Sequence, residues 1–320
     1  MASSNKVSVI GPAIVDILAG PVDKGIFDRK SNITDNIRQS YGGNALNEAV
    51  VLSRLGDNVE LISKVGNDEP GKHILGFLYD NGVGIEKVTV EDDLKTATNI
   101  VLVDHTGERF FLTDPNTNLR KLGLRDIEKH IADMGDIVCF PCMFTSPLLG
   151  IPEMTKLFKC LKEAGNRTIV LDMTTAKNNE TITELSELFS YVDYFLPNEE
   201  ELESLSKNPD VIDSAKEIVS YGAKAVIIKR GSRDTLIVTE NGTQDVPTFK
   251  PERIADTTGA GDCFGAGFIH GLSTGKTLYD SVLFGNVVAS CSVEEYGATD
   301  GVRSEESVLK RLSYYSFGNG

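Results

Sequence analysis

The sequence contains no tryptophan, four histidines and only five cysteines among its 320 residues. The cysteines are scattered, and the single Cys-x-x-Cys pair, Cys139 and Cys142, lacks the second pair that a structural zinc site needs. Buried, reduced thiols are the main expectation for this pair, and a redox or metal role is the alternative. No disulfide framework is expected, which favours a cytoplasmic protein.

Long hydrophobic runs and positive charge are also scarce. No stretch of about 18 apolar residues occurs, so no transmembrane helix is predicted, and the first residues lack the pattern of a signal peptide. Lys and Arg total 32 against 47 Asp and Glu, which gives a net charge of −15. This acidic balance argues against a nucleic-acid or membrane partner.

The order of the apolar runs indicates an α/β fold in a single domain over residues 1–320. Short β-rich runs alternate with helix-like segments, as in a mostly parallel sheet that is flanked by helices on both faces. A helix is expected at Ala45–Leu55 and a hairpin from Thr235 to Val246. The expected strands are Val7–Ile10, Val59–Ile62, Ile137–Phe140, Thr168–Asp172, Tyr194–Leu196 and Ala225–Lys229.

Two segments break this alternation. Residues 13–41 contain no convincing helix, and residues 98–112 have the pattern of two strands joined at His105-Thr106-Gly107. Such a β-rich insertion predicts a small separate sheet, which could close over a ligand as a lid. A decorated edge of the main sheet is the alternative.

Most glycine-rich segments fail as phosphate-binding motifs. In Gly66-x4-Gly71-Lys72, His73 stands where a P-loop needs Ser or Thr. Gly259-x-Gly261 lacks the third glycine of a dinucleotide fingerprint, so a Rossmann dehydrogenase is not expected either.

The segment DTTGAGD at residues 256–262 predicts a different kind of anion site. Gly259, Ala260 and Gly261 begin a long apolar helix, so their backbone N–H groups and the helix dipole favour a phosphoryl group. Asp262 follows immediately, where a general base could act on a hydroxyl beside that phosphate. An ordinary acid at a helix start is the alternative, but it does not explain the small residues that flank Asp262.

Two segments resemble the signatures of one enzyme family. DTTGAGDCFGAGF at residues 256–268 resembles the C-terminal signature of the ribokinase-like (PfkB) carbohydrate kinases, and YGGNALNEA at residues 41–49 resembles their N-terminal signature. The sequence as a whole is most similar to bacterial sugar kinases of unsettled substrate. The resemblance implies a three-layer fold with a mostly parallel central sheet and a small β lid. It also implies ATP and Mg²⁺ as ligands, a sugar under the lid and a homodimer through the lid.

The resemblance implies a role for individual residues. Asp262 corresponds to the catalytic base of the family. Gly259, Ala260 and Gly261 correspond to its anion hole. The residues implied to bind the sugar are Asp16, Gly42, Gly43, Asn44, Asn47 and the lid residue Arg109. Those implied to bind the nucleotide are Asn198, Lys229, Gly231, Asn286 and Ala289, with Glu201 holding hydrated Mg²⁺. A monovalent cation, K⁺, is implied at Asp256, Thr258, Ser292, Glu295 and Gly297.

Simpler explanations stay open for several of these residues. Asn44 stands where several sugar kinases carry lysine, and it could be only a helix cap. Asn286 and Ala289 could serve packing alone, Arg109 could be an exposed hairpin arginine, and the proposed cation site could be a contact between loops.

The expected function is ATP-dependent phosphorylation of a hydroxymethyl group on a small neutral monosaccharide. A second phosphate under the lid would need paired cations, and Arg109 is the only cation that motif and context place there. Asp16, Asn44 and Asn47 suit hydroxyl groups instead. The alternatives are a nucleoside kinase of the same fold, for which only Phe or Tyr could stack on the base, and a non-catalytic sugar-binding regulator.

Overall fold

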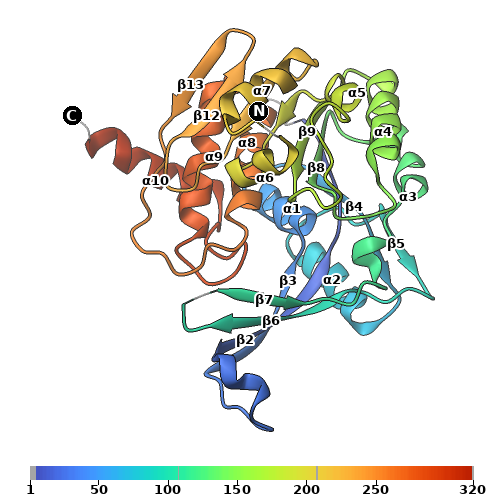
Figure 1. Cartoon of the computed structure of the whole chain (residues 1–320), viewed down its shortest axis with the longest axis vertical. Coiled ribbons are helices and arrows are strands. Elements are labelled where there is room, and N and C mark those ends of the chain that lie inside the picture. The colour runs from blue at the N-terminus through green and yellow to red at the C-terminus, as the bar shows by residue number, and fades with distance from the viewer. Residues whose placement is uncertain (1–4, 107, 207, 319–320) are drawn as a thin grey trace.

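The computed structural model describes residues 5–106, 108–206 and 208–318 (Figure 1). Within these residues, nine strands form the main sheet in the order β13-β12-β11-β10-β9-β8-β1-β4-β5. Seven strands pair in parallel: β1 Val7–Ile10, β4 Val59–Gly66, β5 Val88–Glu91, β8 Ile137–Met143, β9 Thr168–Met173, β10 Tyr194–Phe195 and β11 Ala225–Ile228. At one edge, β12 (Thr235–Thr239) and β13 (Gly242–Val246) form an antiparallel hairpin. The predicted α/β sheet and its hairpin are confirmed.

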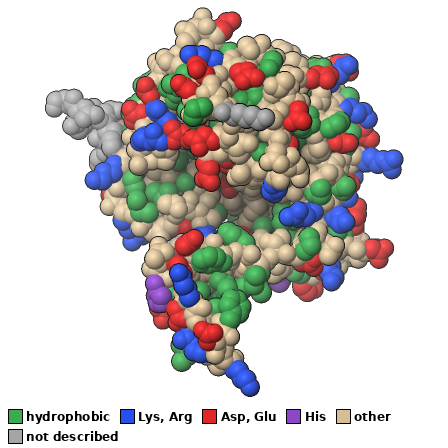
Figure 2. All heavy atoms as spheres, in the orientation of Figure 1, with side chains coloured by type: hydrophobic (Ala, Val, Ile, Leu, Met, Phe, Trp, Pro, Cys, Tyr) green, Lys and Arg blue, Asp and Glu red, His purple; other side chains and the backbone are tan. Residues whose placement is uncertain are grey.

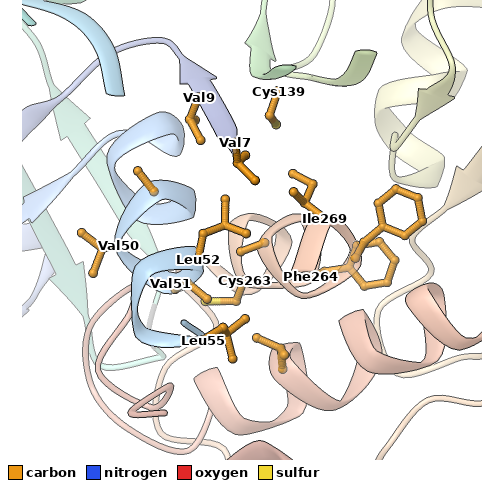
Figure 3. Close-up of a cluster of buried hydrophobic side chains, with 14 of the residues drawn as sticks. Val7, Val9, Val50, Val51, Leu52, Leu55, Cys139, Cys263, Phe264 and Ile269 are labelled. Atoms are coloured by element: carbon orange, nitrogen blue, oxygen red, sulfur yellow. The ribbon is translucent and has the colours of Figure 1, made fainter. Parts of the chain in front are cut away.

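Helices cover both faces of this sheet. Successive side chains of a strand point to opposite faces of the sheet. Val226 accordingly belongs to one buried cluster and Ile227 to the other. The cluster around Ile227 (shown in part in Figure 3) packs against α1 Asn44–Arg54, α2 Glu69–Asp80, α8 Ala260–Ser273, α9 Leu278–Ser292 and α10 Glu305–Gly318. The other packs against α3 Leu124–Glu128, α4 Ile151–Ala164, α5 Ser186–Phe189, α6 Glu199–Leu205 and α7 Val211–Ser220.

The two segments that break the βα alternation form a second sheet. It has four strands among the described residues, in the order β3-β2-β6-β7. Their bounds are β2 Ile14–Val22, β3 Asn36–Gly42, β6 Thr98–Asp104 and β7 Arg109–Leu112. The sheet projects from the body of the molecule at the bottom of Figure 1. We call it the lid. The small separate sheet predicted from the sequence is therefore present.

The glycines inside α8 have a packing role. A Cβ at Gly267 would lie 2.9 Å from the Cα of Gly285, and one at Gly271 would lie 2.6 Å from the Cα of Ser281. Both contacts are with α9, so these glycines let the two helices approach closely. The loss of helix propensity at these positions, about 1 kcal/mol each, is thereby accounted for.

Two other features bear on the sequence-based expectations. Cys139 and Cys142 are buried free thiols of β8. Among the described residues, no helix has both the length and the apolar character that a membrane span needs.

Candidate active site

A cavity of about 710 Å³ lies between the lid and the carboxyl ends of the parallel strands. Figure 2 shows the hollow between the lid and the body. Ligands of open α/β sheets bind at this edge. The residues named from the sequence that line the cavity are Asp16, Gly42, Gly43, Asn44, Asn47, Arg109, Asn198, Glu201, Lys229, Gly231, Asp256, Thr258, Gly259, Ala260, Gly261, Asp262 and Gly297. Asn286, Ala289, Ser292 and Glu295 are not in its lining.

The anion site is built at the start of α8. Gly259 caps the helix in the left-handed conformation, with φ of 70°. A Cβ there would lie 2.6 Å from the carbonyl oxygen of Ala298, so only glycine fits this turn. The first N–H groups of an α-helix have no partner within the helix. Residues 259–261 line the cavity, and the Ala260 N–H donates to the carbonyl oxygen of Thr257 over 3.3 Å. The turn at Gly259 therefore places the start of α8 at the cavity, and its role as an anion hole stays a prediction.

Asp262, in the first turn of α8, is held by two amides from α1. Asn44 Nδ2 donates to Oδ1 over 2.8 Å, and Asn47 Nδ2 donates to Oδ2 over 2.7 Å. Burial raises the pKa of Asp262, and the hydrogen bonds from Asn47 and Asn44, with the charge of Lys229, lower it only in part. The carboxylate is thus a fixed and more basic acceptor than an ordinary aspartate.

The start of α1 brings the amides to this point through two glycines. Gly43 has φ of 96°, and a Cβ there would lie 2.5 Å from the carbonyl oxygen of Pro12. A Cβ at Gly42 would lie 2.4 Å from Oδ2 of Asp16, so Gly42 leaves the space that the Asp16 carboxylate occupies. Asn99 Nδ2 donates to Oδ1 of Asp16 over 2.9 Å. Burial raises the pKa of Asp16, and the hydrogen bond from Asn99 opposes this increase.

A largely buried ion pair lies beside the start of α8. Lys229 Nζ lies 2.5 Å from Oδ2 of Asp172 and 3.9 Å from Oε2 of Glu201. A Cβ at Gly261 would be 3.6 Å from the same Nζ, which places this ammonium next to the first turn of α8. Burial raises the pKa of Asp172 to about 7, and the Lys229 charge limits this increase. The ammonium of Lys229 is therefore paired with Asp172 and lies beside the predicted anion hole.

Asn198 and Glu201 form a capping box at the start of α6. The Asn198 N–H donates to Oε2 of Glu201 over 2.7 Å, and the Glu201 N–H donates to Oδ1 of Asn198 over 2.8 Å. Both side chains line the cavity as well. The motif thus has a structural role, and its role toward Mg²⁺ stays a prediction.

Asp256, just before the anion hole, is paired with an arginine of the lid. Arg109 Nη2 lies 2.5 Å from Oδ1, and Arg38 Nη2 lies 3.9 Å from Oδ2. Thr258 donates to Oδ1 from its N–H and its hydroxyl, and the Gly297 N–H donates to Oδ2. Because both oxygens already have partners, this arrangement does not fit a dehydrated monovalent cation at Asp256.

The sequence of the chain matches a known protein family. Residues 4–305 match the pfkB family carbohydrate kinases. The chain belongs to this family. An uncharacterized sugar kinase from Archaeoglobus fulgidus is 30% identical over 253 residues, which cover 78% of this chain and 97% of that protein. A nucleoside kinase from Methanocaldococcus jannaschii is 26% identical over 314 residues, covering 96% of each.

The fold of this pfkB family member is also found in solved structures. Arabidopsis thaliana ribokinase, in a complex with ribose and ATP, has a TM-score of 0.81 at 22% identity, covering 97% of this chain and 99% of that chain. The three-layer ribokinase-like fold is thereby confirmed. Relatives named for a sugar and for a nucleoside mean that family membership alone does not specify the acceptor.

Several residues that line the cavity of this kinase could not be assigned to the site from the sequence. Asp172, Asn99, Arg38 and Phe111 are the main ones. A signal for Asp172 was present, because it ends a predicted buried strand at the carboxyl edge of the sheet. Whether Asn99, Arg38 and Phe111 line the cavity depends on which face of the lid sheet each residue occupies, and the sequence alone does not show this.

Two residues implied at the nucleotide site lie outside the cavity. The amide of buried Asn286 accepts from Thr235 Oγ1 over 2.7 Å and donates to the carbonyl of Pro247 over 3.0 Å. These bonds tie α9 to the β12–β13 hairpin. A contact of Asn286 or Ala289 with adenine stays a prediction.

Proposed function

We propose that this kinase transfers the γ-phosphoryl group of ATP to a hydroxymethyl group of a small neutral monosaccharide. The observation that carries the proposal is the position of Asp262, a buried carboxylate in the first turn of α8 at the cavity. A base and an anion hole at one point suit transfer of a phosphoryl group to an alcohol.

In the proposed reaction Asp262 accepts the proton of the attacking hydroxyl. The hydroxyl oxygen forms a bond to the γ-phosphorus, and the bond between that phosphorus and the ADP oxygen breaks. The N–H groups of residues 259–261 and the ammonium of Lys229 stabilise the negative charge that develops. Asn44 and Asn47 hold the Asp262 carboxylate in position.

The lining of the cavity fits Mg²⁺. This ion prefers oxygen ligands and typically uses one or two protein carboxylates together with substrate phosphates and water. Asp172, near the carboxyl end of β9, and Glu201, in the first turn of α6, supply carboxylates to the cavity. We propose that Glu201 holds the hydrated ion and that Asn198 and Gly231 flank the nucleotide. When bound, the ion neutralises charge on the phosphates.

The lid side of the cavity supports a neutral acceptor. Asp16 and Asn99 face it from the lid, and a carboxylate with an amide suits hydroxyls that both donate and accept. Arg109, the cation that would hold a second phosphate, is paired with Asp256. A nucleoside is the second candidate, because Phe111 lines the cavity from β7 and is 58% exposed, so its ring could stack on a base.

We also propose a homodimer through the outer face of the lid. Alternate residues of the lid strands face away from the cavity, and their cross-strand rows are apolar over β2, β6 and β7: Ile17–Ile100–Leu112 and Ala19–Leu102–Phe110. On β3 the second row continues with Ile37, whereas the first ends in the polar Gln39. Leu112 is 54% exposed and Phe110 is 49% exposed. Because one-sided sheets normally keep their outer face polar, a second copy of this face is the cover that suits these rows.

The free thiols of Cys139 and Cys142 support a cytoplasmic location.

A substrate screen tests the proposed function. ADP formation is measured with Mg-ATP and a panel of pentoses, hexoses, ketoses, sugar acids, sugar phosphates and nucleosides. The proposal expects the highest kcat/KM with a neutral monosaccharide. A higher kcat/KM with a sugar phosphate contradicts the neutral acceptor, and one with a nucleoside favours the second candidate. Sugar binding without any ADP formation would identify a non-catalytic regulator.

A further inference from the structure

Asp256 connects the lid to the anion hole. It lies two residues before Thr258, and its Oδ1 accepts from the Thr258 N–H over 2.9 Å and from the Thr258 hydroxyl over 2.6 Å. Its Oδ2 accepts from the Gly297 N–H over 3.1 Å. These bonds fix the turn that leads into Gly259 and so fix the direction of the N–H groups of the anion hole. The carboxylate side chain is only 4% exposed.

A buried carboxylate of this kind needs a positive partner. The partner here comes from the lid, since Arg109 is the first residue of β7 and lies 147 positions away in the chain. Burial raises the pKa of Asp256, but the Thr258 and Gly297 hydrogen bonds and the Arg109 charge outweigh burial and lower it. Arg38 of β3 adds a second positive charge at 3.9 Å. Asp256 is therefore ionised and already neutralised by residues of this chain.

The donors around the Asp256 carboxylate leave few acceptor positions for a further ligand. A carboxylate offers about four lone-pair positions, and Oδ1 alone takes three donors in this structure. A dehydrated K⁺ at this carboxylate would have to displace the Arg109 guanidinium.

We propose that the guanidinium of Arg109 takes the place of a monovalent cation at Asp256, so that the anion hole is organised by closure of the lid instead of by a bound K⁺. Arg109 is then a positioning residue for the phosphoryl site and not a substrate ligand. The sugar lies between the lid and the body, so the charge that organises the anion hole is delivered by the same sheet that covers the sugar.

The test compares K⁺ with tetramethylammonium at equal ionic strength in the wild type and in Arg109→Met. The first readout is the melting temperature, which does not depend on the proposed function. The wild type should melt at the same temperature in both salts. Arg109→Met should melt at least about 2 °C higher in KCl, because K⁺ then fills the vacated site. The second readout is the rate of ADP formation, which rests on the proposed function. That rate should be independent of K⁺ in the wild type and should recover about tenfold with K⁺ in the variant.

Three controls make the test decisive. Arg29→Met removes another lid arginine, one that pairs with Asp23 away from the cavity, and should behave as the wild type. Arg109→Gln repeats the test if the methionine variant folds poorly. In the double variant Arg109→Met/Asp256→Asn, the response to K⁺ should disappear.

Several outcomes would overturn the inference. One is a wild type that is stabilised or activated by K⁺, and another is an Arg109→Met protein whose melting temperature does not respond to K⁺. A K⁺ response that persists in the double variant places the ion elsewhere. If no acceptor is phosphorylated, the proposed function fails, and the melting temperatures alone still decide the role of Arg109.

Discussion

The side-chain amide of Asn47 donates a 2.7 Å hydrogen bond to Oδ2 of Asp262, although the two residues are 215 positions apart in the chain. Asn47 lies in the first turn of α1 and Asp262 in the first turn of α8. The bond therefore joins the two sequence signatures of the family at one carboxylate. An amide donor stabilises the charged form of that carboxylate and fixes its orientation.

Removing this donor should change the pH dependence of the reaction. The base must be deprotonated, and burial raises the pKa of Asp262. The acid limb of kcat/KM should therefore lie above the value of about 4 for an ordinary aspartate. In Asn47→Ala the charged form loses a hydrogen bond, so the limb should move to higher pH. A pH–rate profile of both proteins checks this, and a limb that stays in place or moves to lower pH contradicts it.

Lys229 should act in catalysis more than in sugar binding. Lys229→Met removes the buried positive charge beside Gly261, so kcat should fall by about 10²-fold or more, as when a preorganised group that stabilises charge is lost. The KM for the sugar should change little. Lys216→Met, which changes an exposed lysine of α7, is the matched control and should have no effect. A variant at position 229 with normal kcat excludes Lys229 from the transfer step.

Gly42 should be required for the sugar site. A methyl group there would meet Oδ2 of Asp16 at 2.4 Å, so Gly42→Ala must displace that carboxylate. We expect at least a tenfold rise in the sugar KM (about 1.4 kcal/mol of binding free energy) with a small change in the ATP KM. Gly76→Ala is the control, because its Cβ meets nothing within 4 Å. An unchanged sugar KM would argue against Asp16 as a sugar ligand.

The outer face of the lid should control the oligomeric state. Leu112→Asp places a charge within the apolar rows, and sedimentation should then show a monomer where the wild type is a dimer. Leu148→Asp substitutes an equally exposed leucine outside the lid and should leave the dimer intact. A wild-type protein that is monomeric at all concentrations contradicts the proposed interface.

The sequence predicts the elements of this fold well because their periodicity is local. The strands at Val7–Ile10 and Thr168–Asp172, and the hairpin from Thr235 to Val246, follow from short apolar runs and turn residues. Some boundaries differ: β4 continues to Gly66 and β10 ends at Phe195. These ends depend on pairing with neighbouring strands, which no local pattern contains.

The candidate site is only partly encoded in local patterns. The signatures single out Asp262 and Asn47, because each residue stands at a fixed position within its signature. The pairs Lys229–Asp172 and Arg109–Asp256 join residues 57 and 147 positions apart. Such pairs follow from strand order and from how far the lid lies over the body, so a single sequence reveals the separate residues but not their contact.

The most direct test of the proposed function concerns Asp262. In Asp262→Asn, turnover of the best acceptor should fall by at least about 10²-fold, as expected when a general base is lost, while calorimetry should show ATP affinity close to that of the wild type. Asp213→Asn, which changes an exposed acid in the first turn of α7, should retain full turnover. Turnover near the wild-type value in Asp262→Asn would contradict the assignment of Asp262 as the base that activates the sugar hydroxyl.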